Sequence, residues 1–221
     1  MQNRYSPGRL AIIIVITIML VSFIQLGALT LAFYKLGLTP DSAMLLLFAS
    51  LLGSIINLPL FRLQAEARNE AIPMRVFGLL RPLQPIFRGY TTIAINIGGG
   101  LIPLSFSLYL IQHSAASLSE FALCIFVISL LSYFISRPLH GIGIGMPVFI
   151  APICAALLAL SINPEHAAAL AYSGGTLGVL IGADLLRLKD IRKMGTPVAS
   201  IGGAGTFDGI FITGIVAVLL T

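Results

Sequence analysis

Asp184 and Asp208 are the acidic side chains best placed to do chemistry, because each lies within a long apolar stretch of the chain. A carboxylate at the centre of a membrane helix costs about 2.5–3.5 kcal/mol on insertion scales, so a plain anchor would not carry one. Two carboxylates a few ångströms apart in a low dielectric share a proton, and one then serves as base while the other serves as acid. The pair therefore predicts either acid–base chemistry or a pathway for protons or cations.

Glycine-rich stretches mark the place where such side chains would meet a ligand. The chain reads SIGGAGTFDGIF from Ser200 and INIGGGLIPLSF from Ile95. Two glycine-broken helices in corresponding positions indicate a central binding site, although the match is short and chance similarity is an equal alternative. The expected binding residues are Asn96, Gly98, Gly99, Gly100, Gly202, Gly203, Gly205, Thr206 and Asp208.

The composition indicates an integral membrane protein. Of the 221 residues, 57% are hydrophobic and only 10% are charged, whereas soluble domains carry about 25% charged residues. The apolar runs are about 20 residues long and do not alternate, which favours helices over a barrel. We therefore expect an all-α fold, with residues 1–221 forming a single transmembrane domain. The seven expected helices are Leu10–Tyr34, Ser42–Phe61, Thr91–Gln112, Ser117–Ser136, Ile142–Ile162, His166–Leu186 and Val198–Leu220.

The distribution of basic residues predicts the orientation of these helices. With the N-terminus in the cytoplasm and the C-terminus outside, every Lys and Arg except Lys35 falls on the cytoplasmic side, as the positive-inside rule requires. A basic cytoplasmic segment at 62–90 follows from the same arrangement. The formal charge of +5 is thereby explained without nucleic acid as a partner. We expect membrane lipid and other membrane-protein subunits as partners, in the inner (cytoplasmic) membrane of the cell.

Metal and cofactor sites are not expected. His113 and His166 fall on the outer side of the predicted membrane and His140 on the inner side, so a bilayer separates them. The chain shows no Cys/His spacing typical of zinc sites, no phosphate-binding loop and no nucleophile elbow.

Each candidate residue also has a structural explanation. Asp184 can pair with Arg187 or Lys189 at the cytoplasmic rim, where a salt bridge is worth little. Asp208 or Thr206 can accept hydrogen bonds from backbone N–H groups that a broken helix leaves free. Asn96 can hydrogen-bond between helices, which is the more common role of such a residue in membranes.

Two resemblances bear on function. Asp184 in GADLLRLKDI and Asp208 in GAGTFDG resemble in part the GxGD intramembrane aspartyl proteases, which implies that these two residues form a catalytic dyad. The segments INIGGGLIPLSFSLYL, GADLLRLKDI and GGAGTFDGIFITG are similar to DUF1614, an uncharacterised family of bacterial and archaeal membrane proteins, which implies seven spans and no particular reaction.

Three functions are therefore open. The first is a small transporter or ion-coupled carrier with its site around Asp208. The second is an intramembrane protease that uses Asp184 and Asp208. The third is a non-catalytic subunit of a larger membrane complex, which the small size and the many small residues favour.

Overall fold

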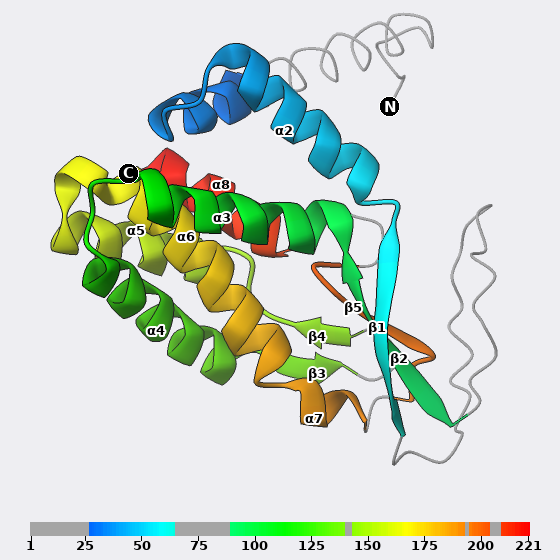
Figure 1. Ribbon diagram of the computed structural model, residues 1–221. Coiled ribbons are helices and arrows are strands. Elements are labelled where there is room, and N and C mark those ends of the chain that lie inside the picture. The colour runs from blue at the N-terminus through cyan, green and yellow to red at the C-terminus, as the bar shows by residue number, and fades with distance from the viewer. Residues whose placement is uncertain (1–26, 65–88, 140–142, 193–194, 204–208) are drawn as a thin grey trace, which may run out of the picture.

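The computed structural model describes residues 27–64, 89–139, 143–192, 195–203 and 209–221. The larger helices gather on one side of the molecule, and the strands with the short helix α7 lie on the other side (Figure 1). The helices are α2 (Pro40–Gly53), α3 (Ile102–His113), α4 (Leu118–Ile135), α5 (Ile150–Ile162), α6 (Ala167–Val179), α7 (Leu188–Ile191) and α8 (Gly209–Leu220), with π-helical turns η1 (Ile97–Leu101) and η3 (Leu180–Leu185) and a 3₁₀ turn η2 (Pro164–His166). The strands are β1 (Asn57–Gln64), β2 (Tyr90–Asn96), β3 (Arg137–Leu139), β4 (Gly143–Gly145) and β5 (Val198–Ile201).

The mostly helical class is confirmed, but the strands depart from the all-α expectation. The runs expected as helices at 42–61, 91–112, 142–162 and 198–220 each combine a helix with a strand. In β2, the β-branched residues Thr91, Thr92, Ile93 and Ile95 favour extended backbone over helix. Apolar composition alone therefore overestimated the lengths of these helices.

Two helices in the described part of the chain are long and apolar enough to cross a membrane. They are Leu118–Ile135 and Pro164–Leu185, with 18 and 22 residues. At 1.5 Å per residue they span about 27 and 33 Å, close to the thickness of a bilayer's hydrocarbon core. A third candidate is the pair Gly27–Lys35 and Pro40–Gly53, which is bent by 114°. The number of seven spans stays a prediction.

The sheet joins segments that are far apart in the chain. Its strand order is β1-β2-β5, with β1 antiparallel to β2 and β5 parallel to β2. In the parallel pair, Ile95 lies opposite Ile201. The two glycine-rich stretches directly follow β2 and β5, so this register places them side by side. A separate hairpin consists of β3 and β4.

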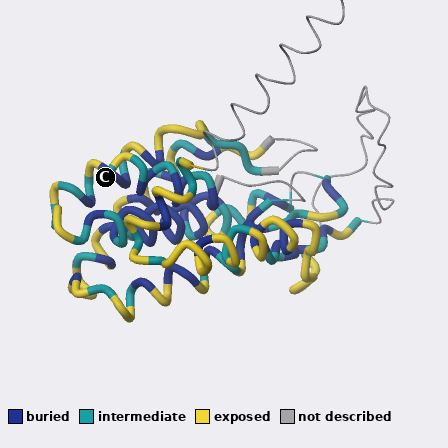
Figure 2. The backbone as a smooth tube through the Cα atoms, turned by 90° about the horizontal axis from the view of Figure 1, so that it is seen from above, coloured by how far each residue is buried: buried dark blue, intermediate teal, exposed yellow. Residues whose placement is uncertain are grey.

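Helix α6 forms the centre of the helical part. In the most apolar 18-residue stretch of the candidate span that contains it, 72% of the residues are buried, against 28% in α4. Figure 2 shows the buried backbone enclosed by exposed turns. Leu170 clusters with Ala217, whereas Val179 and Leu180 cluster with Ile210, so α6 and α8 run antiparallel. Antiparallel packing is the usual arrangement of consecutive helices joined by a short connection.

Glycines on α6 and η3 allow α4 to approach closely. A Cβ on Gly174 would lie 2.8 Å from Cβ of Cys124, and one on Gly178 would lie 2.6 Å from Cβ of Ile128. A Cβ on Gly182 would overlap the carbonyl oxygen of Ser129. The contacts advance together along both helices, so α4 and α6 run parallel. Spacing of four residues between small side chains is typical of close helix packing in membranes.

Replacing Gly182 with alanine should lower the free energy of unfolding by about 3 kcal/mol, the upper part of the range for overpacked cores. The added methyl group meets backbone that cannot rotate away. Gly175→Ala is the matched control, because its Cβ would lie 3.1 and 3.4 Å from side-chain atoms of Thr213 and Ala155 and at an ordinary contact distance, 3.7 Å, from the carbonyl oxygen of Thr213. Unfolding of both variants in detergent measures the difference, and equal losses would contradict the packing described here.

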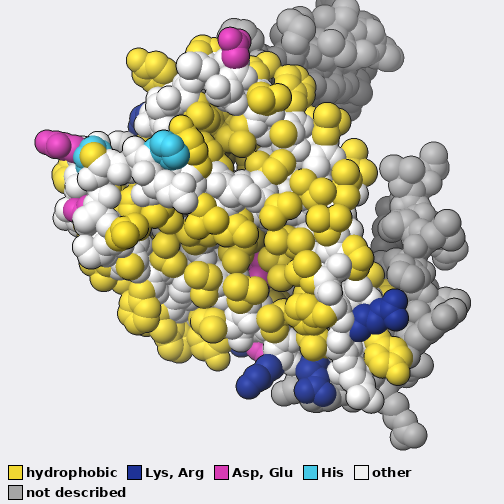
Figure 3. All heavy atoms as spheres, viewed as in Figure 1, with side chains coloured by type: hydrophobic (Ala, Val, Ile, Leu, Met, Phe, Trp, Pro, Cys, Tyr) yellow, Lys and Arg dark blue, Asp and Glu magenta, His cyan; other side chains and the backbone are white. Residues whose placement is uncertain are grey.

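Four basic residues gather at one end of the molecule, together with Asp190. Arg137 follows α4, and Arg187, Lys189 and Arg192 lie on or beside α7. Arg192 Nε donates to the carbonyl oxygen of Gln64 at 3.0 Å, which joins the end of β1 to this group. Figure 3 shows basic side chains along the lower edge, and histidine with acidic side chains at the upper left. The described residues thus carry most of their basic side chains at the end of the molecule that contains α7.

Candidate functional site

The predicted glycine stretches meet directly. We call the place where Gly99 and Gly100 contact Gly202 the glycine crossing. A Cβ on Gly99 would overlap the carbonyl oxygen of Gly202, and a Cβ on Gly202 would overlap backbone atoms of Gly100. Gly202 and Gly203 also have φ of +79° and +90°, values that side chains disfavour. Only glycine therefore allows the two segments to leave the parallel strands at this point.

Asn96 ties the glycine crossing to the preceding segments. Its Nδ2 donates to the carbonyl oxygen of Ser54 at 2.7 Å and to Oδ1 of Asn57 at 3.0 Å. Its Oδ1 accepts from the N–H of Gly99 at 2.8 Å, which caps η1. Ser200 Oγ lies 2.6 Å from the same Oδ1 of Asn57. One polar network thus joins strands β1, β2 and β5 at the edge where the glycines begin.

The partners of Asn96 fix the direction of each hydrogen bond. A backbone carbonyl only accepts and a backbone N–H only donates, so the amide of Asn96 has one possible orientation. Asn57 then receives both hydrogen bonds on its oxygen, and Ser200 is the donor. Asn96 is completely buried, Ser200 is half-buried and Asn57 is exposed. The network therefore runs from the interior of the molecule to its surface.

The alternative role of Asn96 as a structural hydrogen-bonding residue is thus supported. Its side chain caps η1 and joins the strand to the turn at Ser54. The groups that remain available for a ligand are the hydroxyl oxygen of Ser200 and the amide nitrogen of Asn57, which makes no hydrogen bond to the described residues. Asn96 positions these groups. Both N–H groups of its own amide are already used within the protein, so its nitrogen has none left for a ligand.

Two groups of the sequence-predicted site residues fall on π-helical turns. Gly98–Gly100 lie in η1, and Asp184 lies half-buried in η3. The π-helix is rare and is found disproportionately at functional sites. Ala183, the neighbour of Asp184, clusters with Ile93 of β2 and Ile210 of α8. The turn that carries Asp184 therefore packs against the sheet and the first turn of α8.

Gly205, Thr206 and Asp208 lie outside the described residues. Asp208 is bonded to Gly209, the first residue of α8. The dyad of Asp184 and Asp208 stays a prediction, as does the proposal that Asp208 lines a binding site. The glycine crossing, as far as it is described, contains no charged side chain, so Asp208 is the acidic residue closest to it along the chain.

Arg187 has a structural role at the end of α4. Its Nη2 donates to the carbonyl oxygens of Tyr133 and Ser136 at 2.7 and 3.0 Å. Its guanidinium carbon lies 4.4 Å from the centre of the Tyr133 ring, and its Nη1 forms an ion pair with Asp190 at 3.0 Å. The last carbonyls of a helix have no partner within it, so Arg187 caps α4 and fixes α7 beside it.

Replacing Arg187 with alanine should lower the free energy of unfolding by about 2–3 kcal/mol, because two carbonyl oxygens lose a charged donor. Asp190→Asn should lower it by less than about 1 kcal/mol, since a partly exposed ion pair contributes little. The measurement is unfolding in detergent at matched protein concentration. If both variants lost the same amount, the ion pair rather than the cap would hold α7 in place.

The binding residues expected from the sequence include neither Ser200 nor Asn57. Asn57 stands out as an amide within an apolar run, a signal that is visible in the sequence. Ser200 offers no such signal, because its role depends on the pairing of β5 with β2. The described residues contain no group of three or more His, Cys, Asp or Glu side chains that could hold a metal ion.

The comparisons with known proteins identify a family. A protein-family model described as "Protein of unknown function (DUF1614)" matches residues 51–220. The matched region contains the glycine crossing, its polar network and both aspartates. No curated protein and no solved structure matches the chain.

Proposed function

Because the chain belongs to the family Protein of unknown function (DUF1614), whose name assigns no activity, we propose its function from the glycine crossing. The proposed function is the movement of a small cation or polar solute across the membrane. The main observation in favour of this function is the buried Asn96 network, which lies where two glycine-broken segments run side by side.

The architecture supports this proposal on physical grounds. Irregular backbone at membrane depth is tolerated where protein covers it or where it lines a watery path. Transporters place their sites where broken helices from two similar units meet. Here each unit consists of a strand, a glycine break and a helix, namely β2 to α3 and β5 to α8. The two units are parallel neighbours, as a parallel internal repeat requires.

The site offers groups suited to a cation or to a polar solute. The hydroxyl oxygen of Ser200 donates its proton to Asn57 and keeps its lone pairs for a ligand. Asp208 adds a negative charge, and an intramembrane carboxylate marks many proton and cation pathways. In the proposed mechanism Asp208 binds the cation or proton, while Asn57 and Ser200 contact it through the network that Asn96 holds in place.

The proposal includes seven spans in the cytoplasmic membrane, with the N-terminus inside and the C-terminus outside. Parallel α4 and α6, together with an α8 antiparallel to α6, have the directions that this topology requires. The basic end formed by Arg137 and the residues around α7 would face the cytoplasm.

Ser200→Ala should lower the flux of the transported ion about tenfold, since it removes one ligand without disturbing the interior. The test is reconstitution of the full chain into vesicles, with proton, sodium and potassium flux followed separately. Ser105→Ala is the matched control, because Ser105 is exposed on α3 and its hydroxyl donates locally, to the carbonyl oxygen of Leu101 four residues earlier. Its flux should equal that of the wild type.

Two results would overturn the proposal. The first is that vesicles containing the wild type take up every tested ion and small polar solute no faster than empty vesicles do. The second is equal flux in the Ser200 and Ser105 variants, which would place the path elsewhere in the molecule.

A further inference from the structure

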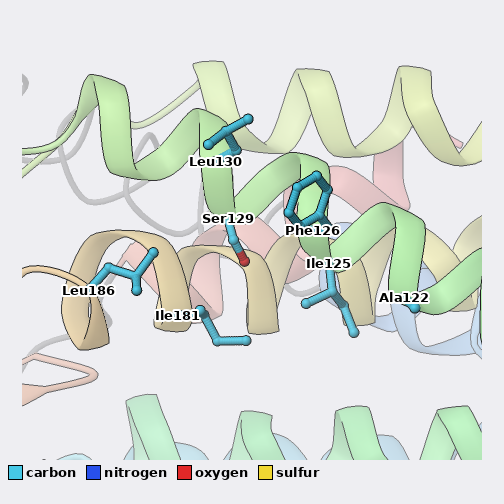
Figure 4. A pocket seen from close by; sticks show the side chains of 7 residues that line it. All are labelled: Ala122, Ile125, Phe126, Ser129, Leu130, Ile181 and Leu186. Atoms are coloured by element: carbon cyan, nitrogen blue, oxygen red, sulfur yellow. The ribbon is translucent and has the colours of Figure 1, made fainter.

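An apolar groove runs along the outer face of α4. Its volume is about 460 Å³, and Figure 4 shows its side chains on α4 and on the facing turn η3 and its end. Six of its seven lining residues are apolar, and Ser129 turns its hydroxyl toward η3. The lining residues are Ala122, Ile125, Phe126, Ser129, Leu130, Ile181 and Leu186.

The groove lies on a surface that must be covered by apolar material. Phe126 is 65% exposed and Leu130 is 47% exposed, and both lie within the apolar span Leu118–Ile135. In water a patch of this kind marks an interaction surface. On a helix that crosses a membrane, the acyl chains of lipids are the material at this depth.

One end of the groove is basic. Since α4 and η3 run parallel, the groove leads along both toward the end formed by Leu130 and Leu186. Lys189 follows Leu186 by three residues, and Arg137 is the second residue after the end of α4. Both basic side chains are exposed, and neither forms an ion pair with the acidic residues that the structure describes. Arg187, in contrast, has its charge engaged by Asp190 and two carbonyls.

We propose that this groove is a binding site for an anionic phospholipid of the cytoplasmic leaflet. One acyl chain lies along Ala122, Phe126 and Leu130, and the phosphate contacts Lys189 and Arg137. Basic pockets between helices on the cytoplasmic side are suited to anionic headgroups. A second copy related by a twofold axis along the membrane normal is a poorer occupant, because it would bring the basic ends of both copies to the same side of the membrane, where like charges repel.

The test is native mass spectrometry of the full chain in detergent, with phosphatidylglycerol and phosphatidylcholine added in turn. The wild type should bind phosphatidylglycerol about thirtyfold more tightly, in line with two basic contacts at the membrane surface. In R137Q/K189Q the two lipids should bind equally. Lys35→Gln is the matched control, because Lys35 lies at the other end, within 3.4 Å of the carbonyl oxygen of Val218, and should keep the preference.

A second variant tests the part of the groove that would bind the acyl chain. Ala122 is exposed in the groove, so Ala122→Phe fills the space without entering the core and should weaken binding of both lipids. The proposal is overturned if the wild type shows no lipid preference, if R137Q/K189Q retains it, or if inorganic phosphate displaces phosphatidylglycerol completely. Unchanged lipid binding in Ala122→Phe, with a shifted monomer–dimer equilibrium, would instead assign the groove to a second copy and also overturn the proposal.

Discussion

Asn96→Ala should lower the free energy of unfolding by about 3–5 kcal/mol and abolish flux. The substitution leaves the carbonyl oxygen of Ser54 and the N–H of Gly99 without their partner inside the molecule. A buried polar group left unsatisfied costs about 1–3 kcal/mol, and loss of the cap frees the first turn of η1. Unfolding in detergent and flux in vesicles measure the two effects.

Asn163→Ala provides the matched comparison for this variant. Asn163 lies between α5 and η2, where its side chain contacts Glu120 and the N–H of His166 at 3.2 and 3.4 Å. That site is partly open to solvent, so the loss should stay near 1 kcal/mol, as is typical of a cap. Similar losses in both asparagine variants would mean that the Asn96 network does not hold the glycine crossing together.

Asp208→Asn should lower flux at least about tenfold while leaving the fold intact. Asparagine keeps the size and the hydrogen-bonding oxygen of aspartate but removes its charge and its ability to bind a proton. An intramembrane carboxylate is costly and is usually kept for such a role. Flux through vesicles at equal amounts of reconstituted protein measures the effect, with Asp190→Asn as the control for loss of a carboxylate elsewhere.

The protease hypothesis makes a different prediction for the same residues. A dyad requires both carboxylates, so cleavage of a membrane-spanning peptide should be lost equally in Asp184→Asn and Asp208→Asn. A carrier centred on Asp208 requires no cleavage by the wild type. The third hypothesis, a subunit of a larger complex, predicts that the chain copurifies with fixed partners rather than alone.

The sequence identified the glycine crossing without showing how it is built. The similarity of two short segments puts Gly98–Gly100 and Gly202–Gly203 in corresponding positions, and glycine is costly in a membrane helix. Their direct contact follows from the parallel pairing of β2 and β5. Apolar composition and charge bias do not report such pairing, so the strands were assigned to helices.

Residues that act through tertiary contacts were the hardest to predict. Ser200 is one hydroxyl among many, and only the pairing of β1 and β5 with β2 brings it to Asn57. Arg187 was considered a rim charge, whereas its main contacts are carbonyl oxygens at the end of α4. In both cases the partner is more than fifty residues away in the chain, beyond the reach of periodicity or local spacing.

The central claim is that the glycine crossing and Asp208 form a path for a small cation or polar solute. Its most direct test is the initial rate of flux into vesicles that contain the wild type, Asp208→Asn or Asp190→Asn, with folding of each checked beforehand. We predict a rate well above that of empty vesicles for the wild type and Asp190→Asn, and a rate near that of empty vesicles for Asp208→Asn. Equal rates in all three proteins would contradict the claim.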